Sequence, residues 1–172
     1  MKNERVRTLC RVALLAALAL ALSVLEGVFT PVLPPGARAG LSNVAVMLAA
    51  SVLGLPSALA IVLCKAVFAL LTRGAVSFLL SLSGGVVSAL LLWVLFRTVR
   101  VFGNLGVSTL GALAHSLTQL AVSLLLYGSA VLAYAPVMIL FSVPSGCITA
   151  VLLSAAAPIL FRKTNETKGT PL

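Results

Sequence analysis

The sequence predicts an all-α, polytopic membrane protein with six transmembrane helices. Hydrophobic residues make up 61% of the 172 residues and charged residues only 9%, whereas a soluble domain carries about 25% charged residues. Several long stretches are almost free of charge, and a helix of roughly 20 apolar residues crosses the hydrocarbon core of a bilayer. Short basic clusters or Pro and Gly residues separate these stretches, as in the loops of a membrane protein.

The first predicted helix runs from Val12 to Leu25, because no charge occurs between Arg11 and Glu26. The side chains of these two residues can reach the interfaces and extend a short helix to a full span. The next segment, Gly27 to Gly40, holds three prolines and three glycines. Proline removes a backbone donor and clashes with the preceding turn, so we expect a long first loop here.

The second and third helices share one apolar segment, Leu41 to Thr72, which is too long for a single span. Gly54-Leu55-Pro56 breaks it in the middle. We therefore expect a short second helix from Asn43 to Leu53 and a third from Pro56 to Thr72. Proline suits the first position of a helix, where its missing N–H costs nothing.

The last three helices occupy the C-terminal half. Val76 to Phe96 is a clear fourth span. No Lys, Arg, Asp or Glu occurs from Val101 to Phe161, and one helix of that length would far exceed the bilayer, so the stretch must fold back. We expect the fifth helix at Val107 to Tyr127 and the sixth at Pro136 to Leu160, bent at Pro144.

Basic residues fall unequally on the two faces of a six-helix topology, and the face with more of them is expected to be cytoplasmic. This predicts a basic cytoplasmic N-terminus (residues 1–11), a single six-helix transmembrane domain (12–161) and a short cytoplasmic tail (162–172), in the cell membrane. Two cations, Arg38 and Arg73, remain on the outer face. The cytoplasmic set is Lys2, Arg5, Arg7, Arg11, Arg97, Arg100, Arg162, Lys163 and Lys168.

The composition also excludes several functions. The three acidic residues are Glu4, Glu26 and Glu166, and the chain has no Asp, so we expect no catalytic carboxylate site, no metal and no cofactor. The three cysteines are widely spaced without a CxxC pair and are expected to pack as small apolar residues. The cations lie between apolar runs rather than along a hydrophilic face, so the basic excess predicts no nucleic-acid binding.

Polar residues inside predicted spans are candidates for ligand contact, because they are costly in a bilayer. Lys65 lies within the third helix and either contacts a ligand in an internal cavity or reaches an interface or Glu26. His115 and Gln119 are one turn apart and either bind a ligand or hydrogen-bond to neighbouring helices. They share one predicted inward face with Ser108, Gly111, Thr118 and Ser123. On the sixth helix, Ser142, Ser145, Gly146 and Thr149 either line a cavity or only bend the helix.

The outer end of the predicted bundle collects Glu26, Arg38 and Arg73, with Lys65 beneath them. The start of the second helix lies nearby, at Ser42 and Asn43. Three cations, one acid and a helix N-terminus favour an anion such as a carboxylate or phosphate. We therefore expect a small anionic or amphipathic solute to bind from the outer side; the alternative is that the arginines are interfacial residues. The candidate ligand-binding residues are Glu26, Arg38, Asn43, Lys65, Arg73, His115 and Gln119.

The first helix carries small residues at every fourth position, Ala13, Ala17 and Ala21. Small residues at this spacing allow close approach of another helix. They serve either packing within the bundle or docking of a partner subunit. Ser81, Gly85 and Ala89 form a similar stripe on the fourth helix, which we expect to face inward.

Three segments resemble the "Gx transporter" family, which is also labelled heptaprenyl diphosphate synthase component I. They are PPGARAGLSNVAVMLAASVLG (Pro34 to Gly54), FLLSLSGGVVSALLLWVL (Phe78 to Leu95) and GALAHSLTQLAVSLLLYG (Gly111 to Gly128). The six helices, the alanine-striped first helix and the proline-bearing first loop are similar to the substrate-binding S component of an energy-coupling-factor (ECF) transporter.

The resemblance implies a small-molecule substrate bound near the outer side and a transmembrane coupling subunit with cytoplasmic ATPases as partners. It assigns partner docking to Ala13, Ala17 and Ala21, and places Arg38, Asn43, His115 and Gln119 in the ligand pocket. Its second label implies a role in polyprenyl diphosphate or quinone biosynthesis. Chain elongation of that kind uses Asp-rich Mg²⁺ sites, so without Asp the chain is expected to be a non-catalytic accessory subunit there, not an enzyme. It also lacks the GxxxxGK[ST] loop that binds ATP.

Overall fold

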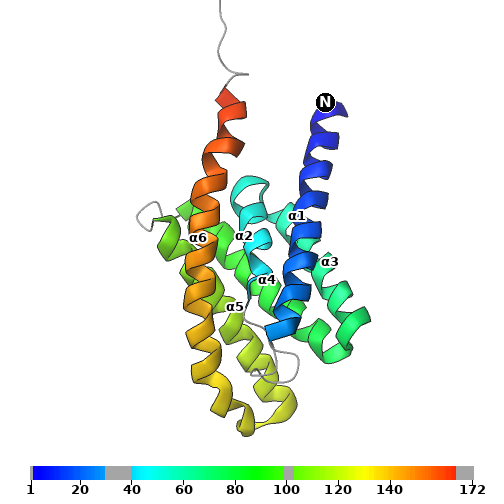
Figure 1. Cartoon of the computed structure of the whole chain (residues 1–172), viewed down its shortest axis with the longest axis vertical. Helices are drawn as coiled ribbons and strands as arrows, with labels where there is room; N and C mark the ends of the chain where they lie inside the picture. Colours follow the sequence, from blue (N-terminus) through cyan, green and yellow to red (C-terminus); the bar gives the residue numbers. More distant parts are fainter. Residues whose placement is uncertain (1, 30–39, 99–102, 166–172) are drawn as a thin grey trace, which may run out of the picture.

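The computed structural model describes residues 2–29, 40–98 and 103–165, which form helices and no strands (Figure 1). The elements are α1 (Lys2–Phe29), α2 (Asn43–Val52), α3 (Leu55–Arg73), α4 (Ala75–Thr98), α5 (Asn104–Tyr127), the 3-10 helix η2 (Ser129–Tyr134) and α6 (Ala135–Asn165). The predicted all-α, six-helix membrane bundle is confirmed. Each α-helix overlaps the range expected from the sequence.

Five segments are long and apolar enough to cross a bilayer, and α2 is the exception. Its 10 residues give a length of about 15 Å, half of a hydrocarbon core of about 30 Å. The other differences are small: α1 already begins at Lys2, so the basic residues before Val12 form its first turns. At the other end, α6 is continuous through Pro144. The chain is thus a multi-pass membrane protein in which one helix is too short to cross the hydrocarbon core.

Successive helices run in opposite directions (Figure 1). The first turn of α3 lies beside the start of α1, where Ser57 and Thr8 line the same groove. Near the other end, Arg73 of α3 donates a hydrogen bond to the carbonyl of Ser23 in α1. α1 and α3 are therefore parallel, and α2 returns between them. The N-terminus and the end of α6 lie at the same end of the bundle, as an even number of passes requires.

The short helix α2 sits at the centre of the bundle and contacts every other α-helix. Its residues from Asn43 to Ala50 are all buried. It starts deep inside, because Gly40 lies against His115 in the middle of α5. Non-helical backbone at such depth is tolerated where protein surrounds it, and Gly40, with a φ of +90°, is itself buried. The first loop, whose residues 30–39 lie outside the described part, therefore ends inside the bundle.

Candidate solute-binding site in the bundle interior

The interior of the bundle is lined by polar side chains on α4, α5 and α6. The predicted inward face of α5 is confirmed for its buried members, while Thr118 is only half-buried and bonds to its own helix. The inward stripe of α4 is confirmed as well. The buried polar residues of these three helices are Ser77, Ser81 and Ser88 of α4, Ser108, His115, Ser116, Gln119 and Ser123 of α5, and Ser142, Ser145 and Thr149 of α6.

Two glycines bring backbone against the imidazole of His115. A Cβ on Gly84 of α4 would lie 2.9 Å from the ring of His115, closer than side chains pack, so only glycine fits there. On another side, a Cβ on Gly40 would lie 3.6 Å from the ring and 3.7 Å from Oγ of Ser145. Residues from α4, α5, α6 and the start of α2 therefore meet around one histidine.

The two ring nitrogens of His115 have different neighbours. Its Nε2 lies 3.1 Å from the side-chain nitrogen of Gln119, one turn along α5. Because an amide nitrogen can only donate, Nε2 accepts, and the neutral ring then carries its proton on Nδ1. Nδ1 faces Gly84 and interacts with the backbone of that residue, although not with the geometry of a normal hydrogen bond. Among the described residues, Nδ1 therefore has only a weak backbone partner.

Asn43, the first residue of α2, is also half satisfied. Its Nδ2 donates to Oγ of Ser88 on α4, at 2.7 Å, while its Oδ1 is buried without a partner among the described residues. Ser88 lies one turn from Gly84 on the same helix, which is about 5.4 Å along the axis. The unpaired Oδ1 of Asn43 and the Nδ1 of His115 therefore lie within about one turn of each other along the axis of α4.

Of two buried serines on α6, one forms hydrogen bonds within the described part of the chain and the other does not. Ser142 donates to Ser116 of α5 at 2.6 Å and lies near the carbonyl of Met138 at 2.8 Å. Ser145, one turn further on, is 2% exposed and its Oγ has no partner among the described residues. Burying a polar group without a hydrogen bond is costly. Ser145 and Asn43 therefore offer two unpaired polar groups beside the imidazole of His115.

Glu26 and Lys65 are buried at one side of this region. The Glu26 carboxylate accepts the backbone N–H of Leu41 and the hydroxyl of Ser42, the latter at 2.8 Å. It therefore sits at the N-terminus of α2, where the helix dipole favours negative charge. Lys65 is 2% exposed and interacts electrostatically with both Glu26 and His115. The buried charges thus form an internal pair beside the open polar groups.

The structure changes one part of the expected site. The α2 N-terminus, which we expected to attract an anionic solute, already holds the carboxylate of Glu26. Arg73 is exposed, and its guanidinium binds the Ser23 carbonyl 2.9 Å away while interacting electrostatically with Glu26. Arg73 thus ties α3 to α1 at the edge of the bundle. Arg38 lies outside the described residues. Glu26, Asn43, Lys65, His115 and Gln119 are brought together in the interior.

Several contributors were not singled out from the sequence. Ser88 and Ser116 were missed because a single serine on an apolar helix has no distinctive spacing. Gly84 is part of a Gly-Gly pair in the sequence, and this pair was the available signal for a close helix contact. In the described residues, no group of three His, Cys, Asp or Glu side chains is arranged to hold a metal ion.

The alanine stripe of α1 faces away from the bundle. Ala13, Ala17 and Ala21 are all exposed, whereas Ala19, on the opposite side of the helix, is fully buried. Among the described elements, α1 contacts only α2 and α3. Internal packing therefore does not use the stripe.

The sequence model of one protein family, described as heptaprenyl diphosphate synthase component I, matches residues 15–156. This range includes α2 to α5 whole and most of α1 and α6. The chain belongs to this family. Neither the curated proteins nor the solved structures include a significant match to it.

Proposed function

We propose that this member of the heptaprenyl diphosphate synthase component I family is the membrane-embedded, substrate-binding S component of an ECF-type uptake transporter. Its solute is small and anionic or amphipathic, and binds in the bundle interior. The protein lies in the cell membrane with both termini in the cytoplasm. The excess of basic residues at the two ends of the chain supports this orientation.

The observation that carries the proposal is the set of open polar groups around the start of α2. The acceptor Oδ1 of Asn43 and the hydroxyl of Ser145 are buried without partners among the described residues, and Nδ1 of His115 has only its backbone contact with Gly84. A buried polar group without a hydrogen bond lowers the stability of a fold by roughly 1–3 kcal/mol. A solute that forms hydrogen bonds with these groups offsets this loss, and the positions of the groups then determine which solute fits.

The charges of the interior support an anionic or amphipathic solute. Lys65 contributes a buried ammonium within electrostatic range of His115, and both His115 and Ser145 have hydrogens to donate. Hydrogen-bond donors that lie close to a cation favour a carboxylate or phosphate oxygen. The apolar residues of the surrounding helices suit the rest of an amphipathic molecule.

The proposed protein binds its solute but neither transforms nor pumps it alone. The absence of Asp and of a GxxxxGK[ST] sequence supports a binding subunit that depends on separate ATPases for energy. We assign docking of the coupling subunit to Ala13, Ala17 and Ala21, because this stripe is exposed and small residues allow close helix contact.

Co-purification tests this assignment. Tagged protein from its native membrane is expected to bring down a membrane subunit and ATPases, and Ala17→Leu should remove them while leaving the bundle folded. The matched control is Ala121→Leu, which makes the same change at an exposed position of α5, a helix whose described residues do not contact α1. Capture that is equal for Ala17→Leu and Ala121→Leu, or solute accumulation by the reconstituted chain alone, contradicts the proposal.

A second function is favoured by the family description itself. A "component I" implies another component, and a non-catalytic membrane subunit would hold a soluble prenyl synthase near its lipid product. The same purification distinguishes the two functions. A soluble prenyl synthase in the eluate, with no ATPases, supports the accessory role and excludes the transporter.

A further inference from the structure

A groove of about 480 Å³ separates the start of α1 from the start of α3. It lies at the end of the bundle that holds the N-terminus (Figure 1), away from the polar interior around His115. Its volume is in the range of roughly 300–1,000 Å³ that is typical of small-ligand sites. The lining residues are Arg5, Thr8, Leu9 and Val12 of α1 and Pro56, Ser57 and Ala60 of α3.

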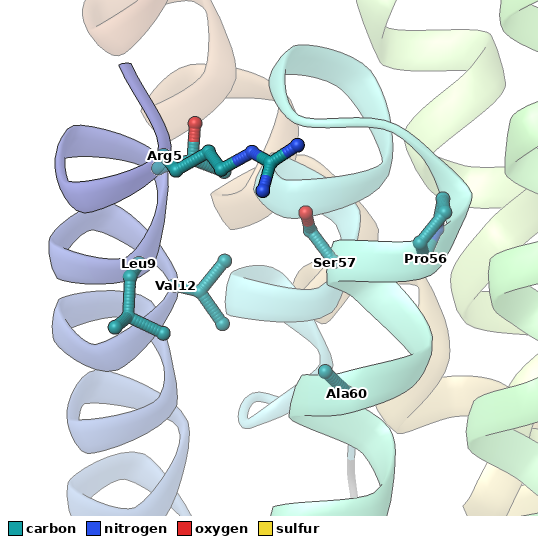
Figure 2. Close-up of a pocket in the computed structure, with 7 residues that line it drawn as sticks. Arg5, Leu9, Val12, Pro56, Ser57 and Ala60 are labelled. Carbon is teal, nitrogen blue, oxygen red and sulfur yellow. The ribbon is translucent and has the colours of Figure 1, made fainter. Parts of the chain in front are cut away.

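The groove has a polar mouth and an apolar body. Figure 2 shows the side chain of Arg5 extending from α1 across the mouth towards Ser57 in the first turn of α3. Leu9 and Val12 lie below it on α1, and Ala60 lies deeper on α3. A guanidinium and hydroxyls therefore stand at one end of a channel whose remaining walls are aliphatic.

We propose that this groove binds an anionic phospholipid, with its phosphate at Arg5 and one acyl chain along Leu9, Val12 and Ala60. An arginine recognises phosphate oxygens through two parallel hydrogen bonds. The Ser57 hydroxyl, which donates to the carbonyl of Leu53 at 3.5 Å, adds a polar group to the mouth. Aliphatic walls match the hydrocarbon that follows the phosphate.

Charge at this end of the molecule supports the same occupant. Arg7 and Arg11 follow Arg5 on α1, within the stretch from Arg5 to Val12 that borders the groove. Basic residues just outside a hydrocarbon core attract anionic lipid headgroups, and basic pockets between helices hold them. The site is independent of the interior solute site, so either can fail without the other.

Native mass spectrometry of protein from mixed phosphatidylglycerol and phosphatidylcholine micelles tests the proposal. Wild-type protein is expected to retain phosphatidylglycerol. Arg5→Ala should reduce its retention by about tenfold, the order expected for loss of a charge-assisted, bidentate contact, and Arg5→Lys should restore part of it. Arg7→Ala, which removes the same charge from the same helix but outside the groove, should reduce retention much less, because it removes only the general attraction of the helix end for anionic headgroups.

A variant that fills the groove distinguishes a lipid bound inside it from lipid that is attracted to the surface by charge alone. Ala60 is exposed, so Ala60→Phe is expected to fold, to occupy the channel and to lower retention as much as Arg5→Ala does. Equal losses for Arg5→Ala and Arg7→Ala, or retention indifferent to Ala60→Phe, overturn the proposal. Displacement of phosphatidylglycerol by equimolar farnesyl diphosphate also overturns it, and assigns the groove to a prenyl diphosphate.

Discussion

The two helices α1 and α2 are both rich in alanine and other aliphatic residues, yet they are buried to very different extents in the bundle. In α2 every residue from Asn43 to Ala50 is buried, whereas only 11% of the apolar window of α1 is. α2 contacts all the other α-helices, and α1 contacts two. In lipid, apolar composition does not decide burial, because lipid tails are as apolar as the interior. Position in the bundle decides it.

Glu26 is the point at which these two helices are joined. Its carboxylate, near the end of α1, accepts both a backbone N–H and a hydroxyl from the residues that lead into α2. The peripheral helix is thus held to the central one by a buried charge.

The largest expected effect comes from removing the hydrogen bonds of Glu26 to Leu41 and Ser42. Glu26→Ala should lower the free energy of unfolding by about 3–5 kcal/mol, because it leaves Lys65 as an uncompensated buried charge. Glu26→Gln should cost less, since its amide oxygen can still accept one hydrogen bond. Unfolding in a detergent series measures both. If Glu26→Ala is as stable as the wild type, the two helices are not joined here.

The next largest effect is expected when the same alanine-to-leucine substitution is made in each of the two helices. Ala49 of α2 is fully buried, so Ala49→Leu overfills the centre and should cost about 1–3 kcal/mol. Ala17→Leu on the exposed face of α1 should leave stability within about 0.5 kcal/mol. Melting temperatures of the two proteins in the same detergent make the comparison. Equal losses would mean that α1 is as tightly packed as α2.

A third, smaller loss of stability is expected at the exposed arginine of α3. Arg73→Ala removes the bond to the Ser23 carbonyl and should cost about 1 kcal/mol or less, because water screens the exposed guanidinium. Hydrogen exchange should rise at the end of α1 and stay unchanged in α2. Arg97→Ala, in the last turn of α4, is the control and should leave α1 exchange unaltered. Increased exchange in α2 would show that α1 supports the centre directly.

The sequence was sufficient to predict the helices, because charges, prolines and glycines mark their ends. It also predicted the inward face of α5 from the spacing of its polar residues. It could not show that Glu26 is buried, since its donors come from Leu41 and Ser42, which only the path of the first loop brings to it. Nor could it show whether Ala17 faces a neighbouring helix or the outside, because both surroundings are apolar.

Other parts of the site depended on pairs between helices. Ser116 and Ser142 are 26 residues apart and form a hydrogen bond with each other. The spacing of residues within either helix does not predict this pair. The same holds for Asn43 and Ser88, which meet across 45 residues. Long-range pairs of single polar residues become visible only when the helices are packed.

The most direct test of a solute site in the interior is native mass spectrometry of gently purified protein, compared between wild type and Ser145→Ala. We expect the wild type to retain one small molecule, and Ser145→Ala to lose it without losing stability, because the hydroxyl has no partner among the described residues of the bundle. Ser142→Ala, whose hydroxyl bonds to Ser116, is the control and should melt at a lower temperature. A wild-type protein that carries no solute, or a Ser145→Ala variant that retains the solute as well as the wild type, would contradict an interior solute site.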